Sequence, residues 1–469
     1  MNGIFALLFG GFLALIALNA QSAEGDSSLI NPDFEIAGPN SDTPLSWSLT
    51  SNALKVSLDQ EVRLSGKSSV RIERNQGPAF SGINQPVDAT PFRGKTVIVR
   101  GYFKGKNLQT GNAGLWLRID GQQPASNPVS SFSKPITNDD SWVARQVVAQ
   151  VGAGATRIIV AAINGTTGVL WADNFSMEVL KIDEPISLPS NVSSYLDDAL
   201  EKIQANALKA PAIDWVHLRK IAYALSRNAK NSTDTHESIA FVLAQLNDRH
   251  SHLIPAARVK EATDRQISDN VDFRASLISD YGYISIPSFA AVASSRTTAY
   301  VDVAHSKLIE LANNKPCGWI VDLRQNTGGN MYPMLASLSF FLGNGVHGYS
   351  ISRTSKTPWE IVDGVAISGD AKAAPTKSQM IQGAISAPVA VLLGPRTASA
   401  GEAIAVSFVG RQNTRSFGQR TAGLTTANKP IFLSDGSAIA LASATLADRT
   451  GQTFASSVLP DESVPAGNS

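Results

Sequence analysis

The pattern of apolar and polar positions divides the chain into three parts behind an apolar leader. Between residues 28 and 180, short segments alternate apolar and polar residues and are separated by glycine, proline and asparagine. Residues 97–103 and 115–119 alternate as half-buried antiparallel strands do, and residues 157–163 form the more continuous apolar run of an inner strand. Residues 28–182 are therefore predicted to form an all-β sandwich.

The next part, residues 190–256, has the period of helices. Apolar residues recur at helical spacing over 196–207, and again over 239–246 behind candidate N-caps at 232–234. The polar and charged stretch 255–280 is predicted to be a loop. We expect a small helical region ahead of a third part.

From residue 281 onward, predicted strands alternate with predicted helices. Strands are expected at 283–286, 317–323 and 389–393, and helices at 298–311, 332–342 and 403–409. This order predicts an α/β core over residues 275–469 with a mainly internal sheet. Cys317, the single cysteine, precedes the apolar run 318–321 and is expected to be a small buried residue. One cysteine cannot close an internal disulfide or build a thiolate metal site.

The apolar leader predicts where the protein is located, and the net charge bears on which partners it binds. Residues 4–18 are almost entirely apolar and are followed by small residues at Ala20 and Ala23, which predicts a signal peptide over 1–23. The run is shorter than the roughly 20 residues of a spanning helix. The mature protein is expected to be periplasmic or secreted, with no membrane span. Forty Lys and Arg against 39 Asp and Glu leave a net charge of +1, which favours no nucleic-acid partner.

Two loops of the predicted core carry candidate chemistry. Residues 322–329 leave a buried strand and end in Gly328 and Gly329, whose freedom lets backbone amides approach a ligand closely. Residues 394–402 place Ser399 where an apolar helix begins. The amides and dipole of a first helical turn stabilise a developing oxyanion there. By position alone, the role of a helix N-cap explains Ser399 better than catalysis does.

The two loops together resemble a known family. Asp-Leu-Arg-x-Asn-x-Gly-Gly at 322–329, Thr-Ala-Ser-Ala-x-Glu at 397–402 and Arg-Ser-Phe-Gly at 415–418 are similar to the motifs of C-terminal processing (tail-specific) serine peptidases. The resemblance runs from about residue 192 to the carboxyl end and implies a crotonase-like core. It implies Ser399 as nucleophile, with oxyanion amides from Ala400 and from Gly328 or Gly329. No cofactor and no metal are expected.

The family resemblance, together with the absence of the usual lysine, predicts that the general base is a histidine. The best-known branch places a lysine where this chain has Gln419, and glutamine cannot accept a proton. Relatives similar to the tricorn core protease use histidine, and His250 lies in a segment that resembles theirs. We expect His250 to be the base, with His252 as its competitor. Three other histidines fall on predicted helices and one in a loop: His217, His236, His305 and His347.

The sequence does not identify the third catalytic group or the substrate. Ser251, Glu402, Asp448 and Asp461 are all candidates to orient the histidine. Between residues 255 and 281 there is no room for the PDZ module that usually captures carboxyl-terminal tails. A serine peptidase acting on a peptide or protein is the leading expectation. The alternatives are an esterase on the same site and a ligand-binding protein without catalysis.

The amino-terminal module has a resemblance of its own. Residues 31–35, 44–47 and 173–175 are similar to segments of galactose-binding-like jelly-roll modules. Such modules often bind carbohydrate beside a catalytic domain. Carbohydrate binding and a spacer role are both compatible with the sequence.

Overall fold

The computed structural model describes residues 28–465 except 40–41, 52–53, 76–79, 110, 122–128, 134, 265–271, 292–293, 370, 374–383 and 455. The predicted signal peptide lies outside the described residues. The chain forms two compact units, Met1–Lys181 and Ile182–Ser469, which we call the first and second unit. Within the described residues, no helix combines the length and the apolar character needed to cross a bilayer.

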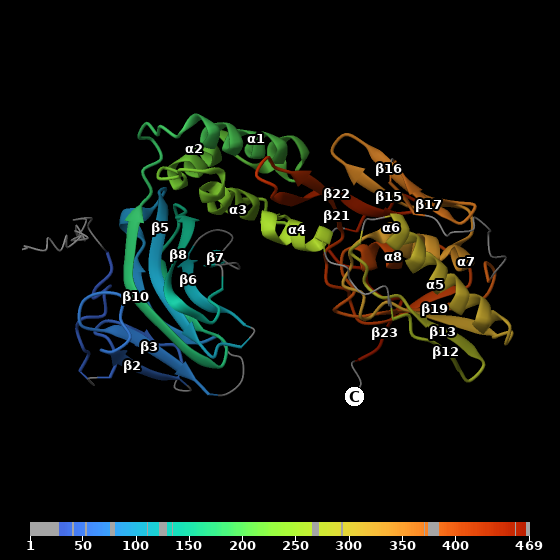
Figure 1. Ribbon diagram of the computed structural model, residues 1–469, viewed down its shortest axis with the longest axis horizontal. Helices are drawn as coiled ribbons and strands as arrows, with labels where there is room; N and C mark the ends of the chain where they lie inside the picture. The colour runs from blue at the N-terminus through green and yellow to red at the C-terminus, as the bar shows by residue number, and fades with distance from the viewer. Residues whose placement is uncertain are drawn as a thin grey trace, which may run out of the picture. The chain divides into compact units, whose positions relative to one another are not determined.

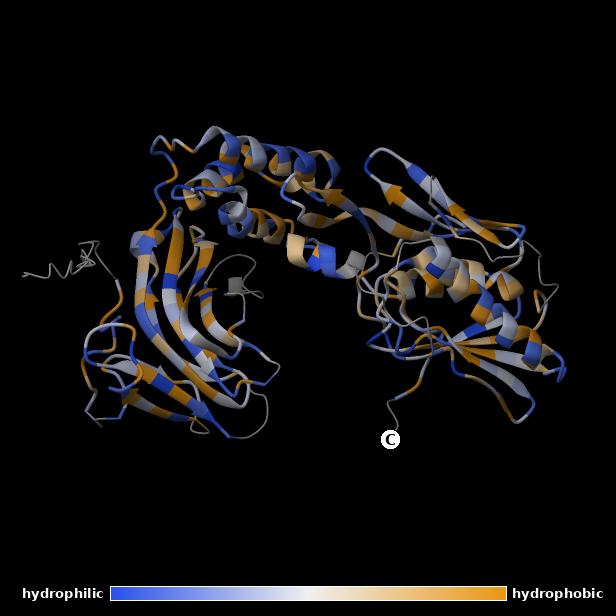
Figure 2. Cartoon of the chain, in the orientation of Figure 1, coloured by the Kyte–Doolittle hydropathy of each residue, from blue (hydrophilic) through white to orange (hydrophobic). Residues whose placement is uncertain are grey.

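The first unit is a sandwich of two antiparallel five-stranded sheets, so the predicted all-β jelly-roll is confirmed. Apolar and polar residues alternate along its strands (Figure 2). The inner positions, such as Val70, Ile72 and Leu117, are fully buried between the sheets. One sheet has the order β1 (Ser48–Leu49), β4 (Gly82–Asp88), β9 (Arg157–Asn164), β6 (Ala113–Asp120) and β7 (Val129–Phe132). The other has the order β2 (Lys55–Asp59), β3 (Ser69–Arg74), β10 (Gly168–Val179), β5 (Thr96–Lys106) and β8 (Asp139–Gln150).

The residues that suggested a jelly-roll module build its core and turns. The rings of Phe34, Trp47 and Phe175 contact one another with centroids 5.0 to 5.5 Å apart. Asp173 is fully buried and accepts hydrogen bonds from the amides of residues 64, 65 and 174; burial raises its pKa to about 6. These motif residues therefore have a structural role in this fold.

The second unit begins with helices that pack on a distant hairpin. They are α1 (Ser190–Asn206), α2 (Trp215–Leu225) and α3 (His236–Gln245). Their apolar faces share a core with β21 (Thr426–Phe432) and β22 (Ala438–Asp448), where Leu200, Ile239 and Leu441 are buried together. The helical region therefore completes its core with the carboxyl-terminal part of the chain.

A six-stranded sheet forms the base of the second unit. Its order is β12 (Ala275–Ile278), β13 (Tyr281–Ser285), β14 (Gly318–Asp322), β19 (Val389–Leu393), β20 (Thr414–Gly418) and β23 (Glu462–Ser463). All neighbours are parallel except the edge pair β12–β13. Parallel neighbours end at the same edge of a sheet, so the loops after β14, β19 and β20 leave side by side.

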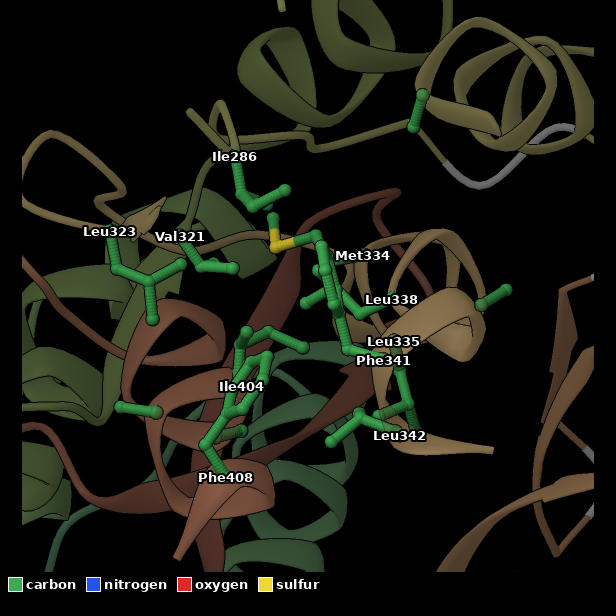
Figure 3. Close-up of a cluster of buried hydrophobic side chains, with 14 of the residues drawn as sticks. Ile286, Val321, Leu323, Met334, Leu335, Leu338, Phe341, Leu342, Ile404 and Phe408 are labelled. Carbon is green, nitrogen blue, oxygen red and sulfur yellow. The ribbon is translucent and has the colours of Figure 1, made fainter. Parts of the chain in front are cut away.

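Four helices cover one face of this sheet and a second sheet lies beyond them (Figure 1). The helices are α5 (Ser294–Ala312), α6 (Met331–Ser337), α7 (Ser339–Leu342) and α8 (Ala400–Phe408). The second sheet joins β11 (His252–Ile254), β22, β15 (Gly345–Ser352), β16 (Lys356–Val362), β17 (Val365–Ser368) and β18 (Ala371–Ala373), and β21 pairs with β22. Figure 3 shows Ile404 and Phe408 of α8 directed toward Met334 and Phe341 in the shared core. Helix α8, which begins after Ser399, is thus buried on all sides.

Four local predictions were wrong. The expected loop 255–280 contains α4 (Ala256–Asp264) and β12, both of which are too exposed to carry a strong apolar pattern. Cys317 is exposed because it lies just before β14, where its thiol donates to the Asp280 carbonyl. His347 lies in β15, not in a loop. The helix expected at 332–342 is interrupted at Leu338, which separates α6 from α7.

Candidate active site

Three loops from neighbouring parallel strands meet at one edge of the six-stranded sheet. The loop after β14 contacts the loop after β19 because Thr397 Oγ1 donates to the Leu323 carbonyl, at 2.8 Å, and the Ala398 amide to the Asn326 carbonyl, at 2.9 Å. The loop after β20 joins them through the Ala422 amide, which donates to the Thr397 carbonyl at 2.9 Å. Sheet topology therefore brings both predicted motifs into one place.

Ser399 is held in an uncommon backbone conformation at the start of α8. Its φ of 53° lies in the left-handed region, which is costly for a residue with a Cβ and is found preferentially at functional sites. Ser399 stands at the N-cap position, but its hydroxyl makes no capping hydrogen bond with the first turn. Among the described residues Ser399 Oγ has no hydrogen-bond partner. The hydroxyl is thus free for chemistry.

The glycine loop approaches Ser399 closely. A Cβ on Gly328, whose φ is 101°, would lie 2.8 Å from Ser399 Cβ and 3.0 Å from the Ala400 amide nitrogen. The Gly328 amide donates to Asn326 Oδ1 at 2.9 Å, and Asn326 is fully buried. Within the described part of the chain, the amides of Ala400 and Gly329 have no acceptor. These two amides are available to a ligand, whereas that of Gly328 is already paired.

Glu402 connects the segments around Ser399. Its side chain is fully buried and accepts from the Ser399 amide at 2.9 Å and from the amides of Gly423 and Leu424 at 2.8 Å each. The hydroxyl of Thr421 also donates to this carboxylate. A buried carboxylate with several donors is satisfied, and it fixes each group that donates to it. Glu402 therefore links the start of α8 to the loop that leads into β21.

His250 lies at the other end of that loop. A turn with positive φ at Asn247 and Arg249 presents it, and Asp248 Oδ1 accepts from the His250 amide at 2.9 Å. His250 is only 8% exposed, and its Nδ1 lies 2.7 Å from Thr426 Oγ1. Burial lowers the pKa of His250 below 6.5, although the nearby Asp248 carboxylate acts to raise it. The ring is therefore neutral at physiological pH, as a general base must be.

The fold offers no metal centre in the part that the structure describes. No group of three or more His, Cys, Asp and Glu side chains is arranged there to hold an ion. The acidic residue of the first motif has another role, since Asp322 accepts from Arg324 Nη2 at 2.7 Å and from the Tyr283 hydroxyl at 2.9 Å. These contacts stiffen the end of β14, from which the glycine loop leaves.

Comparison with known proteins finds a match for much of the second unit. Residues 280–464 match the profile of peptidase family S41. This part of the chain is similar to a peptidase family S41 domain. The recognition made from the motifs at 322–329 and 397–402 is thereby confirmed.

Three similar proteins each cover part of the chain. The nisin-resistance protein of Lactococcus lactis subsp. lactis is 27% identical over 286 residues, which are 61% of this chain and 84% of that protein. A lipoprotein from Streptococcus agalactiae has the same fold, with 24% identity, a TM-score of 0.50, and coverage of 60% of this chain and 94% of that chain. A CBM22 xylan-binding domain from Paenibacillus barcinonensis is 19% identical, with a TM-score of 0.27, and covers 34% of this chain and 96% of that chain.

Within the described part of the second unit, the predicted orienting groups do not bond to the His250 ring. Ser251 Oγ donates to Asp248 Oδ2 and accepts from the Ala442 amide. Asp448 closes the turn after β22 through the amides of residues 450 and 452, and Asp461 accepts from Ser416. Glu402 belongs to the nucleophile side. The predicted competitor His252 is exposed, and its Nδ1 lies 3.0 Å from the His250 carbonyl.

The residue that does contact the ring, Thr426, was missed. It lies 176 positions from His250 in sequence, in a segment rich in small and hydroxyl residues. A threonine at the start of an expected strand carries no local mark that distinguishes it from its neighbour Thr425. Only the register of β21 identifies it.

Proposed function

We propose that the protein is a serine peptidase that cleaves peptide bonds through an acyl-enzyme on Ser399. The observation that carries the proposal is the free hydroxyl of Ser399, held at φ 53° against the glycine loop and beside the Ala400 amide. The match of residues 280–464 to peptidase family S41 supports the same reaction class. The parts that such a reaction needs are a nucleophile, a base and oxyanion donors.

In this mechanism His250 Nε2 takes the Ser399 proton while Oγ attacks the scissile carbonyl. The amides of Ala400 and Gly329 donate to the oxyanion, because both lack other acceptors among the described residues. The imidazolium then gives its proton to the leaving amine, and water hydrolyses the ester by the reverse use of the same groups. The proposal requires Nε2 to reach hydrogen-bonding distance of Oγ when substrate binds; no such bond is present among the described residues.

Turnover of casein, of fluorogenic peptides and of nisin by the mature protein tests the proposal. Nisin is included because the Lactococcus relative is named for resistance to it. We expect Ser399→Ala and His250→Ala each to lower kcat by about a thousandfold with the fold retained. Ser434→Ala, at an exposed turn between β21 and β22, is the matched control. Hydrolysis of aryl esters without peptides would favour an esterase. An inert protein that a fluorophosphonate does not label would favour a ligand-binding role.

We also propose that the protein is exported, on the basis of the apolar leader at 4–18. Expression of the full chain and amino-terminal sequencing of the product test this. Cleavage after Ala20 or Ala23 is expected. A product that retains the leader and stays in the cytoplasm would contradict it.

A second candidate function concerns the first unit, for which we propose carbohydrate binding. The outer face of the sheet that contains β6 carries an aromatic cluster, in which the Phe80 ring lies 4.8 Å from Trp116 and 6.5 Å from Phe132. Phe80 is 55% exposed, and the charged pair Arg118–Asp120 lies on the same strand as Trp116. Exposed aromatic faces beside fixed polar groups are suited to sugar rings.

Affinity electrophoresis in gels that contain xylan, a soluble cellulose derivative or soluble peptidoglycan fragments tests this second function. Retardation by one polysaccharide is expected, and Phe80→Ala should abolish it. Tyr102→Ala, an exposed aromatic residue on the other sheet, is the control. Equal mobility of wild type with and without every polysaccharide would indicate a spacer role.

A further inference from the structure

The base of the proposed mechanism has an unusual environment, because no carboxylate in the described part of the chain bonds to its ring. Every carboxylate weighed as its partner is engaged elsewhere: Glu402 with the nucleophile region, Asp448 with its own turn, and Asp461 with Ser416. Asp248 bonds to the backbone of His250 and to Ser251, not to the ring. The side chain that does bond to the ring is neutral, the hydroxyl of Thr426 at 2.7 Å from Nδ1.

The position of Thr426 is determined by a strand that also holds the backbone of His250. Thr426 opens β21 and pairs with Thr445 of β22. Two residues further along, Asn428 Nδ2 donates to the His250 carbonyl at 3.3 Å. Two residues before Thr426, the Leu424 amide is fixed by Glu402 at 2.8 Å. The hydroxyl therefore sits on a rigid element anchored at one end to the nucleophile helix.

The proposed role of His250 as a base assigns the direction of the hydrogen bond. A threonine hydroxyl can accept as well as donate, so the contact of 2.7 Å is compatible with a proton on the ring nitrogen. The nitrogen that faces Thr426 is Nδ1. With its proton on Nδ1, the ring has Nε2 unprotonated, and this is the tautomer that a general base needs.

We propose that Thr426 is the positioning residue of His250, in place of the carboxylate that usually fills this role in serine hydrolases. Its hydroxyl accepts the Nδ1 proton and aims Nε2 at the Ser399 hydroxyl. This inference rests on the proposed serine–histidine peptidase function. During the attack, the Ser399 proton moves to Nε2 and the serine oxygen forms the bond to the carbonyl carbon. The second proton of the imidazolium stays on Nδ1, shared with Thr426, until Nε2 gives up its own to the leaving group.

A neutral partner stabilises the imidazolium less than a carboxylate does, so the charges around the ring matter. Asp248 is the negative group that raises the pKa of His250, and His252 acts to lower it; Arg249 lies on the same turn and donates to the Ala422 carbonyl. From β21, the groups that face His250 are the neutral Thr426 and Asn428. Removal of the hydroxyl should therefore disfavour the charged ring and extend activity to lower pH.

The test compares Thr426→Val, Thr426→Ser and Thr425→Val by steady-state kinetics over pH 4.5–8.5. We expect Thr426→Val to lower kcat about tenfold with KM unchanged and to move the acid limb of kcat/KM to lower pH. Thr426→Ser, which restores the hydroxyl, should return kcat to within about threefold of wild type. Thr425→Val removes a hydroxyl that bonds to the carbonyls of residues 454 and 456, and should leave kcat and the pH limb unchanged.

Several outcomes would overturn the inference. They are a wild-type kcat in Thr426→Val, an equal loss in Thr426→Ser, or the same loss in Thr425→Val. If His250→Ala is inactive while Thr426→Val is fully active, only the role of Thr426 fails. If His250→Ala retains full activity, or wild type hydrolyses nothing, the proposed function fails with it. Should Thr426→Val not fold, Thr426→Ala, which places no extra methyl group against the ring, takes its place with the same expectations.

Discussion

The nucleophile and the base of the proposed site are supported in different ways. Ser399 lies where loops from three neighbouring parallel strands meet, and the fully buried Glu402 carboxylate fixes its amide and the loop after β20. His250 comes from a turn in the helical region, and within the described residues its ring has one side-chain hydrogen bond, with Thr426. The nucleophile is thus placed by the sheet, and the base by a contact between the helical region and a distant hairpin.

This difference predicts different responses to mutation. Damage near Ser399 should lower stability and activity together, because the same hydrogen bonds maintain the fold and the site. Damage near His250 should lower activity with little effect on stability. Four experiments test that contrast.

The largest effect is expected for Glu402→Gln. An amide cannot accept from all four donors and its own NH₂ group would face them, so buried donors would lose their partner. We expect a loss of about 3 kcal/mol in the free energy of unfolding and a fall of at least about a hundredfold in kcat/KM. Urea denaturation and peptide turnover measure the two. The exposed Glu310→Gln on α5 is the control, and a stable, active Glu402→Gln would contradict the contrast.

Gly328→Ala should have the next largest effect. Its Cβ would lie 2.8 Å from both the Ala398 carbonyl oxygen and Ser399 Cβ, and φ of 101° is unfavourable for alanine. We expect about 2 kcal/mol of destabilisation and a fall of about thirtyfold in kcat. Gly345→Ala is a sharp control because its φ of 126° is equally unusual, yet nothing lies within 4 Å of the added methyl group. If both variants lose the same activity, strain rather than the approach to Ser399 is responsible.

His347 is a buried histidine outside the site, and its protonation at low pH should destabilise the fold. Replacing it allows the effect of low pH on stability to be distinguished from the effect of low pH on the proposed base. His347 is 2% exposed, and burial lowers its pKa to about 4. Below the unfolded-state pKa of about 6.5, the unfolded chain binds a proton that the native state does not, so stability falls as pH drops from about 6.5 to about 4. The loss at pH 5 is about 2 kcal/mol. His347→Gln should abolish this pH-dependent loss between pH 7.5 and 5.0, measured by urea unfolding; an unchanged pH dependence would contradict it.

The smallest effect is expected in the pH dependence of kcat/KM, at the pH where activity falls on the acid side. His250 must be neutral to act as base, and burial lowers its pKa below 6.5. Activity should therefore rise with pH through a midpoint below 6.5, and it should persist where an exposed histidine would already be protonated. Short assays of kcat/KM from pH 4.5 to 8.5 in the His347→Gln background keep the fold stable while the limb is recorded. A midpoint above 6.5 would exclude His250 in this environment as the base.

Much of the fold was accessible from the sequence because burial patterns are local. Alternation of period two identified β5 and β6, and the short apolar runs identified β14 and β19. The same reasoning missed α4 and β12, since both are exposed and leave no apolar period. It also missed the break at Leu338 between α6 and α7, because both helices lie in the core and present apolar residues throughout.

For the site, local sequence patterns were enough to predict the elements that depend on neighbouring residues. These are the glycine loop after a buried strand, and a helix that begins at Ser399 with Glu402 three positions later. Three further features became visible only in the folded chain: the Ser399 hydroxyl makes no capping bond, the Gly328 amide is already paired, and Thr426 contacts His250. The physical reason is that a local pattern records which side of an element is buried. Which distant group completes a hydrogen bond depends on strand register and on the packing of the helical region against β21 and β22.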